Sequence, residues 1–236
     1  MKRTLLAILL FLGIQGSAAG IAPVVPHADT ARTVPHWKQA AAPAVLIGAG
    51  VFGMGSWYSS NVNIPIKDYM ADLRQGHYIH ADNYIQYAPL AASVLLSFKK
   101  DYREGWEDRI LLAGTGAAIM AAIVNSAKYS ICEMRPDCSR RNSFPSGHTA
   151  TAFLGAELVR MEYGGWWGAA AYTVAAATGA LRMYNERHWS NDVLAGAGVG
   201  ILSAKLAWWL LPWERRQLGR FIVLPTQSGL ALSITF

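Results

Sequence analysis

Residues 145–159, PSGHTATAFLGAELV, place a tight turn directly before an apolar helix. Gly147 lets the backbone approach a ligand, and the free N–H groups at the helix start form a cradle for an anion together with the Ser146 hydroxyl. His148 stands at the edge of this cradle. Alone, such a sequence is also typical of a loop with a helix cap, so its interpretation depends on the clusters on either side.

The upstream cluster is Lys128-x6-Arg135-Pro136, at the predicted end of a helix. Two permanent cations at a helix end and in the turn after it can clamp phosphate oxygens, and Arg does so in a bidentate way. Pro136 ends the helix at this point. Without other signals, the same cations are typical of a solvated or interfacial helix end.

The downstream cluster is Arg182-x5-His188-x3-Asp192. His188 and Asp192 are four residues apart and lie on one face if the segment is helical. A carboxylate on one imidazole nitrogen fixes the tautomer and leaves the other nitrogen free to attack. A lone His-x3-Asp pair is usually a surface pair, but three such clusters at the edges of apolar helices favour phosphoester chemistry.

The three segments KYSICEMRP (128–136), PSGH (145–148) and RMYNERHWSND (182–192) resemble the motifs of the type 2 phosphatidic acid phosphatase (PAP2) superfamily. That superfamily also contains bacterial class A acid phosphatases and vanadium haloperoxidases. Its pattern is K-x6-RP, PSGH and SR-x5-H-x3-D, and Leu181 stands here where the family usually has Ser. The resemblance covers about residues 105–212 and implies a helical bundle.

The resemblance also assigns roles. The residues implied to bind phosphate are Lys128, Arg135, Ser146, Gly147 and Arg182. His188 is implied to be the nucleophile that forms a phosphohistidine, Asp192 its orienting partner, and His148 the general acid for the leaving alcohol. No metal and no cofactor are implied, because positive groups stabilise the charge on the transferring phosphoryl group.

The composition fits a membrane-associated protein. Of the 236 residues, 53% are apolar and only 15% are charged, which excludes disorder. The net charge of +6 is spread without the basic run that a nucleic-acid partner needs. A chain with two cysteines is too poor in cysteine for a fold held together by disulfides. These cysteines have no neighbouring cluster of His or Cys residues, so they do not indicate a zinc site.

The amino terminus is typical of an export signal over residues 1–19. Lys2 and Arg3 form a positive region, Leu5 to Ile14 an apolar one, and Ser17-Ala18-Ala19 a small-residue cleavage site. A first transmembrane helix is the alternative, although the apolar stretch is short for one. Residues 20–40 are then expected to be a polar linker.

Helices are expected in the longer stretches that contain no Asp, Glu, Lys or Arg, because an unpaired charge inside a membrane-spanning helix is costly. Six stretches qualify: 39–66, 83–98, 110–127, 142–156, 163–181 and 193–204. We therefore predict an all-α, membrane-associated bundle with N-terminal helices over 41–104 and a catalytic core over 105–212. The tail 213–236 is expected to contain a short β-hairpin, because apolar residues alternate with small or polar ones in its last segment.

Charge also predicts the topology. All three motifs are expected at one end of the bundle, and opposite them lie seven cations that belong to no motif: Lys99, Lys100, Arg103, Arg160, Arg215, Arg216 and Arg220. The positive-inside rule makes that second end cytoplasmic. We expect a bacterial inner-membrane protein with a periplasmic active site, in which the Gly-rich segment 41–58 is interfacial or re-entrant. A periplasmic or outer-membrane-associated protein is the alternative.

Cys132 and Cys138 flank Arg135 on this periplasmic side, where disulfides persist. A bond between them is expected to fix the turn that presents Arg135. The alternative is a pair of free thiols.

The expected substrate is a phosphorylated membrane lipid. This sequence is similar to Bacteroides-type lipid A 4′-phosphatases of the superfamily in its export signal and in the segments HADNYIQYAP and RNSFPSGHTATAF. The resemblance implies that the substrate is lipid A. Undecaprenyl-pyrophosphate, phosphatidylglycerophosphate and phosphatidate phosphatases share the motifs, as do class A acid phosphatases. Remoter alternatives are a vanadium haloperoxidase and a membrane anchor with a decayed site. The sequence does not indicate the oligomeric state.

Overall fold

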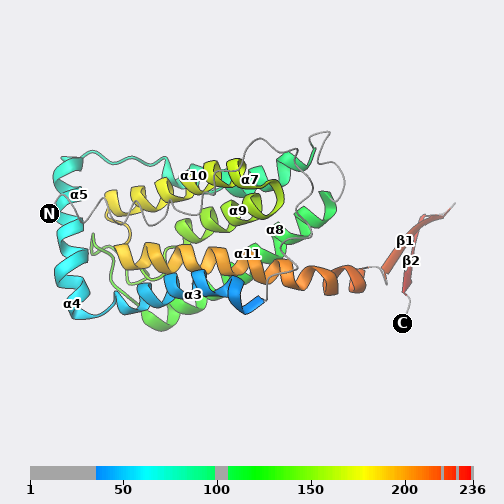
Figure 1. The fold of residues 1–236 in the computed structure, drawn as a ribbon, viewed down its shortest axis with the longest axis horizontal. Coiled ribbons are helices and arrows are strands. Elements are labelled where there is room, and N and C mark those ends of the chain that lie inside the picture. Colours follow the sequence, from blue (N-terminus) through cyan, green and yellow to red (C-terminus); the bar gives the residue numbers. More distant parts are fainter. Residues whose placement is uncertain (1–35, 99–105, 219–220, 227–228, 235–236) are drawn as a thin grey trace.

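The computed structural model describes residues 36–98, 106–218, 221–226 and 229–234. The predicted export signal and most of the predicted linker lie outside these residues. The described part is a helical bundle with two short strands at its carboxyl end (Figure 1). The predicted all-α class of the core is therefore confirmed.

Four long helices form the carboxyl-terminal part of the bundle: α8 (Trp106–Ile131), α9 (Gly147–Tyr163), α10 (Gly165–Tyr184) and α11 (Ser190–Leu218). The elements before them are α3 (His36–Phe52), α4 (Ser56–Tyr58), a π-helical turn (Ser59–Asn63), α5 (Ile64–Arg74), α6 (Asp82–Ile85), α7 (Ala88–Leu95) and a 3₁₀ turn (Leu96–Phe98). Because α3 begins at His36, the last residues of the predicted linker are helical, as the Ala-rich sequence after them favours.

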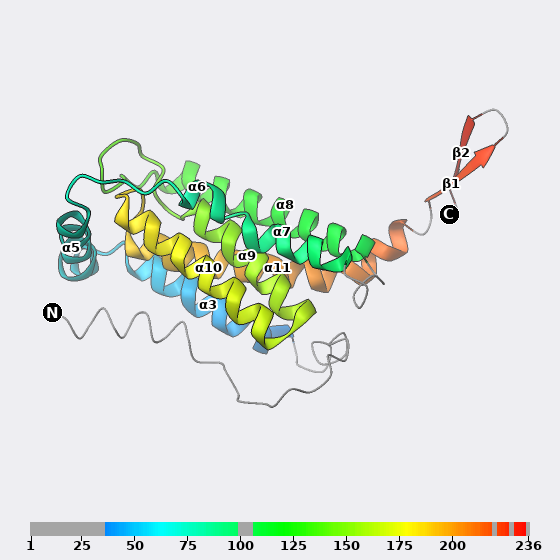
Figure 2. The ribbon, with the colours of Figure 1, turned by 90° about the horizontal axis from the view of Figure 1, so that it is seen from above.

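Helix α9 lies at the centre of the bundle, against α7, α8, α10 and α11 (Figure 2). Of its 17 residues, 13 are buried. Small residues such as Ala150, Ala152 and Gly155 let neighbouring helices approach closely. A helix that is apolar all round is a core helix, so α9 supports the site from within.

A buried ion cluster ties α9, α10 and α11 together at a distance from the motifs. Glu157 accepts hydrogen bonds from Arg160 at 2.7 Å, Lys205 at 2.6 Å and the Tyr172 hydroxyl at 2.6 Å. Buried charges are tolerated when they are paired in this way. Lys205, which interrupts the last apolar stretch of the sequence, is therefore compatible with an uninterrupted helix.

Among the described residues, two helices are long and apolar enough to cross a membrane: α8 and the part of α11 over Ser190–Glu214. The pair Trp37–Phe52 and Ser56–Arg74 passes the same test together but is bent by 83°, which suits a broken span or a re-entrant loop. Helix α3 lies along α11, and α5 lies across the end of the bundle (Figure 1). The interfacial or re-entrant character of segment 41–58 stays a prediction.

The carboxyl-terminal boundary differs from the predicted one. Helix α11 continues through Pro212 to Leu218, although that proline favours an earlier end. Strands β1 (Phe221–Thr226) and β2 (Gly229–Ile234) pair antiparallel at the position of the expected hairpin. They lie beyond the helices in Figure 1, and a two-stranded sheet alone is marginally stable, so a stable hairpin stays a prediction.

Candidate active site

The three motifs meet at one end of the bundle, where four helix ends converge (Figures 1 and 2). Lys128 lies in the last turn of α8, and Arg182 in the last turn of α10. The PSGH segment leads into the first turn of α9, and Asp192 lies in the first turn of α11. Two helix starts at one place favour the binding of an anion.

The second and third motifs are joined directly. The Ser146 N–H donates to the Asp192 carbonyl at 3.0 Å. Gly196 permits this contact, because a Cβ at that position would lie 2.5 Å from the Ser146 carbonyl oxygen. Ser146 also caps α9, since its Oγ accepts a hydrogen bond from the Thr149 N–H at 3.4 Å. The anion cradle is thus fixed against the helix that carries Asp192.

His188 and Asp192 are paired as the spacing predicts. The Nδ1 of His188 lies 3.3 Å from Oδ2 of Asp192, and this oxygen also accepts from the Ser143 hydroxyl at 2.5 Å and the Trp189 N–H at 2.9 Å. Because the carboxylate accepts, we assign the proton of the neutral ring to Nδ1, which leaves Nε2 with its lone pair. Nε2 is therefore the ring atom that is available to act as a nucleophile.

The surroundings of His188 keep its imidazole neutral. Burial lowers the pKa of His188 well below its usual value, and the charges of Arg182, Lys128 and Arg135 lower it further. A neutral ring is a nucleophile, whereas a protonated one is not. The same three cations are close enough to His188 to attract an anion to this ring.

Several donors at the site are free to bind an anion. The Nε atoms of Arg135 and Arg182 are buried and have no hydrogen-bond partner among the described residues. Lys128 is held by the Asn142 carbonyl, which accepts from its Nζ at 2.5 Å. Burial of unpaired donors is costly unless a ligand satisfies them. The phosphate-binding set predicted from the sequence is thus brought together in space.

Asp82 is a site residue that the sequence analysis missed. Its carboxylate forms a buried ion pair with Arg182 at 2.5 Å, and it accepts from the Asn185 amide at 3.2 Å. Asn185 in turn bonds to the backbone of Ile79 at both its carbonyl and its N–H. Asp82 therefore orients Arg182 from the other half of the chain.

We expect Asp82→Asn to destabilise the protein by about 3 kcal/mol, because it leaves the buried Arg182 without its countercharge. Added inorganic phosphate should restore part of this loss by supplying a negative charge. Thermal unfolding in detergent with and without phosphate measures both effects. The control is Asp72→Asn on the exposed face of α5. Equal stability of Asp82→Asn and the wild type would contradict the role of Asp82.

Asn83, next to Asp82, contacts the other histidine. Its Oδ1 lies 3.1 Å from Nε2 of His148, which accounts for the orientation of that ring. Burial and the charge of Arg182 lower the pKa of His148 to about 4. A bound phosphate dianion has the opposite effect on this pKa, because negative charge favours the protonated ring.

Glu133, inside the first motif, is a second missed residue. Burial, the charge of Asp192 and a hydrogen bond with Asp192 together raise its pKa to about 8. Glu133 is therefore protonated at neutral pH and donates a hydrogen bond to Asp192. Glu133 stands at one of the six positions of K-x6-RP where the family pattern accepts any residue, so the sequence did not indicate this contact.

The raised pKa of Glu133 predicts a pH profile. Above pH 8 Glu133 ionises, and a second carboxylate beside Asp192 favours the protonated, non-nucleophilic form of His188. We expect kcat/KM to fall about tenfold between pH 7 and pH 9. Glu133→Gln keeps a hydrogen-bond donor and does not ionise, so its profile should stay level there. A fall of the same size in Glu133→Gln would assign the titration to another group.

The expected disulfide is a correction. Cys132 and Cys138 are both free and exposed. The Cys132 thiol points back along its own helix, where it donates to the Tyr129 carbonyl at 3.3 Å. The turn that presents Arg135 is held instead by backbone hydrogen bonds, from the Arg135 N–H to the Arg140 carbonyl at 3.1 Å and from the Cys138 N–H to the Arg135 carbonyl at 3.0 Å.

Three comparisons relate this chain to known proteins. A lipid A 1-phosphatase of Porphyromonas gingivalis is 45% identical over 136 residues, which are 55% of this chain and 30% of that protein. The chain thus matches less than a third of that relative. The crystal structure of LpxE from Aquifex aeolicus has 21% identity and a TM-score of 0.47, over 60% of this chain and 93% of that one. The model of the PAP2 superfamily matches residues 109–216, a stretch that contains all three motifs, so the similarity to this family covers the candidate site.

Proposed function

We propose that this protein removes a phosphate from a membrane lipid by transferring it to His188, and that lipid A is the substrate. The observation that carries the proposal is the neutral, buried His188, fixed by Asp192 and surrounded by three cations. The relative from Porphyromonas gingivalis supports the substrate through its name.

The reaction follows from the positions of the side chains. Nε2 of His188 attacks phosphorus, and the P–N bond forms as the P–O bond to the lipid breaks. His148 gives its proton to the departing alkoxide. It then takes a proton from a water molecule, which attacks the phosphohistidine and releases inorganic phosphate. Lys128, Arg135 and Arg182 neutralise the charge on the phosphoryl oxygens in both steps.

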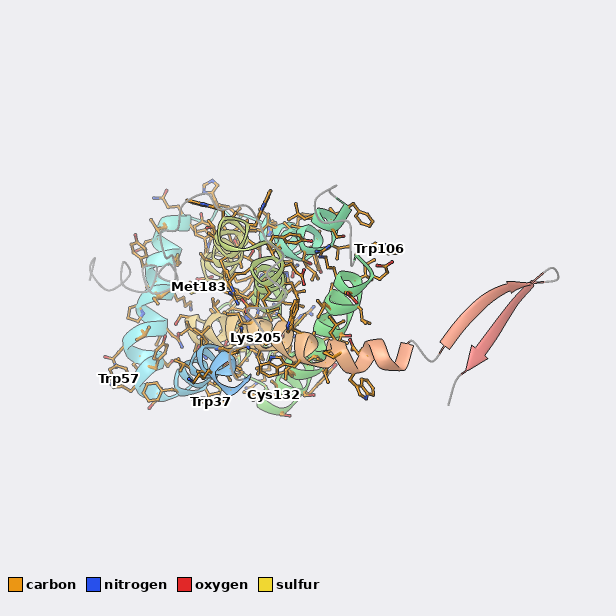
Figure 3. All side chains as sticks on the ribbon, turned by 45° about the vertical axis from the view of Figure 1, so that its right-hand side comes forward. Trp37, Trp57, Trp106, Cys132, Met183 and Lys205 are labelled. Atoms are coloured by element: carbon orange, nitrogen blue, oxygen red, sulfur yellow. The ribbon has the colours of Figure 1, made fainter. Side chains whose placement is uncertain are left out.

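Exposed aromatic residues support a position across a bilayer. At the end with the motifs these are Trp57, Tyr69, Tyr78, Tyr84, Tyr87 and Tyr129, and at the opposite end Trp37, Trp106, Trp166, Trp167 and Trp213. Figure 3 shows Trp57 and Trp106 on the outside, toward opposite ends of the bundle. Aromatic rings gather at both membrane interfaces, and α8, with 26 residues or about 39 Å, is long enough to connect them.

A periplasmic active face is part of the proposal. Arg160, in the last turn of α9, lies at the end opposite the motifs, which favours a cytoplasmic location of that end. If α3 crosses completely, the chain before it is cytoplasmic too, in conflict with an export signal. A periplasmic site and a cleaved signal therefore both hold only if α3 and the bend after it are re-entrant.

The native cysteines at the motif end test this topology. On intact cells a membrane-impermeant maleimide should label Cys132 and Cys138, which are exposed. In a variant that lacks both, Trp166→Cys at the opposite end should react only after the inner membrane is permeabilised. The reverse pattern would place the active site in the cytoplasm.

Phosphate release from a substrate panel tests the function. The panel contains lipid A bearing only the 1-phosphate, lipid A bearing only the 4′-phosphate, undecaprenyl pyrophosphate, phosphatidate and p-nitrophenyl phosphate. The sequence resemblance favours the 4′-phosphate, whereas the named activity of the relative favours the 1-phosphate. Release from neither form of lipid A would contradict the proposed substrate, and release from no phosphoester would contradict the proposed chemistry.

A further inference from the structure

The backbone of Asn83 is held firmly beside the proposed general acid. In the short helix α6 its N–H donates to the His80 carbonyl at 3.2 Å, and its own carbonyl accepts from the amide of the buried Gln86 at 2.9 Å. The residue before it, Asp82, is fixed by the buried ion pair with Arg182. The Asn83 side chain is exposed, so the fold aims it from its backbone and leaves room to replace it.

The contact between Asn83 and His148 determines which ring nitrogen carries a proton. Oδ1 of Asn83 can only accept a hydrogen bond, and it lies 3.1 Å from Nε2 of His148. Burial above all lowers the pKa of His148 to about 4, so the free enzyme holds a neutral ring at pH 7. A neutral imidazole has one proton, and the acceptor places it on Nε2. Nδ1 then keeps the lone pair, and no described residue gives it a hydrogen-bond partner.

Four titratable groups face this ring from other elements: Arg182 of α10, Arg135 of the first motif, His188 before α11 and Asp82 of α6. Beyond the effect of burial, the first three lower the pKa of His148, and Asp82 raises it. Asn83 contacts the ring itself but is uncharged. It therefore gives Nε2 an acceptor without the stronger pull of a carboxylate, which would hold the ring in its protonated form.

We propose that Asn83 is a positioning residue that keeps a proton on Nε2 of His148, so that Nδ1 is the atom that exchanges protons with the substrate. This inference rests on the proposed function and specifies which atom of the general acid acts. In the first step the ring, protonated at both nitrogens beside the phosphate dianion, gives its Nδ1 proton to the departing oxygen as the P–O bond breaks. In the second step Nδ1 takes a proton from the attacking water. The Nε2 proton stays on its hydrogen bond to Asn83 throughout.

NMR of the protein labelled at its histidine nitrogens measures the tautomer directly. In the wild type in detergent at pH 7 we expect a protonated Nε2 and an unprotonated Nδ1 for His148, with its resonances assigned by their loss in His148→Ala. Asn83→Leu keeps the size of the side chain but has no acceptor, so both tautomers should be populated there. The opposite tautomer in the wild type, or an unchanged tautomer in Asn83→Leu, would overturn the inference.

Two soluble esters measure the effect on catalysis. The alkoxide of p-nitrobenzyl phosphate must be protonated as it leaves, whereas p-nitrophenolate leaves without a proton. The ratio of their kcat/KM values isolates proton delivery, because phosphate binding and the attack of His188 affect both esters alike. Asn83→Leu should lower this ratio about tenfold or more, since the acid is no longer oriented. The ratio falls as His148 loses its proton with rising pH, and the carboxylate of Asn83→Asp should move the midpoint of this fall upward by about 1 to 3 pH units.

The matched control is Asn61→Asp, which makes the same exchange at an exposed Asn whose amide donates to the Trp57 carbonyl at 2.7 Å. It should keep the ratio and the midpoint of the wild type. An equal loss on both esters in Asn83→Leu, or an unmoved midpoint in Asn83→Asp, would show that Asn83 does not position the proton. If the wild type cleaves neither ester, the proposed function fails and proton delivery fails with it, whereas the NMR result still decides whether Asn83 sets the tautomer.

Discussion

Replacing His188 by Ala should abolish the turnover of every phosphoester, whatever its leaving group. The substitution removes the imidazole that Asp192 orients, and with it the proposed covalent step. Loss of a nucleophile lowers kcat on the order of 10⁵-fold. Phosphate release from lipid A and from p-nitrophenyl phosphate measures the effect on a poor and a good leaving group.

The control for this substitution is His80→Ala, at an exposed histidine outside the three motifs. Its rates should stay within about twofold of those of the wild type. Because His188 is buried, the thermal unfolding of His188→Ala must be compared with that of the wild type. A folded His188→Ala that keeps more than about one per cent of the activity would mean that another atom is the nucleophile.

Replacing His148 by Ala should affect the two substrates differently. His148 protonates the departing oxygen, which matters for a sugar alkoxide and much less for p-nitrophenolate, whose conjugate acid is far stronger. General acid catalysis contributes about 10² to 10⁴-fold, so the lipid should lose that much in the phosphoryl-transfer step. The aryl ester should lose less than about tenfold in the same step.

The release of p-nitrophenolate before the steady state isolates that step. His148 also activates the water that cleaves the phosphohistidine, so its loss slows the second step for both substrates. We therefore expect His148→Ala to show a burst of about one p-nitrophenolate per active site. Equal losses on both substrates in the first turnover would contradict the role of His148 as the general acid.

The residues that meet at the candidate site could be predicted because their type and spacing are specific. Arg182, His188 and Asp192 belong to one short segment, and the roles proposed for them come from the resemblance to the family motif. Asp82 and Asn83 could not be predicted in this way, because they meet Arg182 and His148 across 100 and 65 residues of chain. The segment HADNYIQYAP was singled out by resemblance, but nothing in its composition indicates which motif residue it contacts.

The helical core could be predicted from the stretches without charged residues, because such stretches are typical of apolar helices. They do not indicate which helix lies at the centre of the bundle and which lie on its outside. Helix α9 is the central helix, and its Glu157 is compatible with that place because Arg160 one turn later and Lys205 of α11 both pair with it. For Cys132 and Cys138 the sequence was misleading, because two cysteines that are close in sequence need not point toward each other.

The most direct test of the central claim is to find the phosphoryl group on His188. His148→Ala is mixed with an aryl ester carrying radiolabelled phosphate, quenched in alkali, in which phosphohistidine survives, and analysed for label on the protein. We predict label that is stable in alkali and lost in acid, located on the peptide that contains His188, and none in the double variant that also carries His188→Ala. Label that persists in the double variant, or that lies on Ser146, would contradict the proposed mechanism.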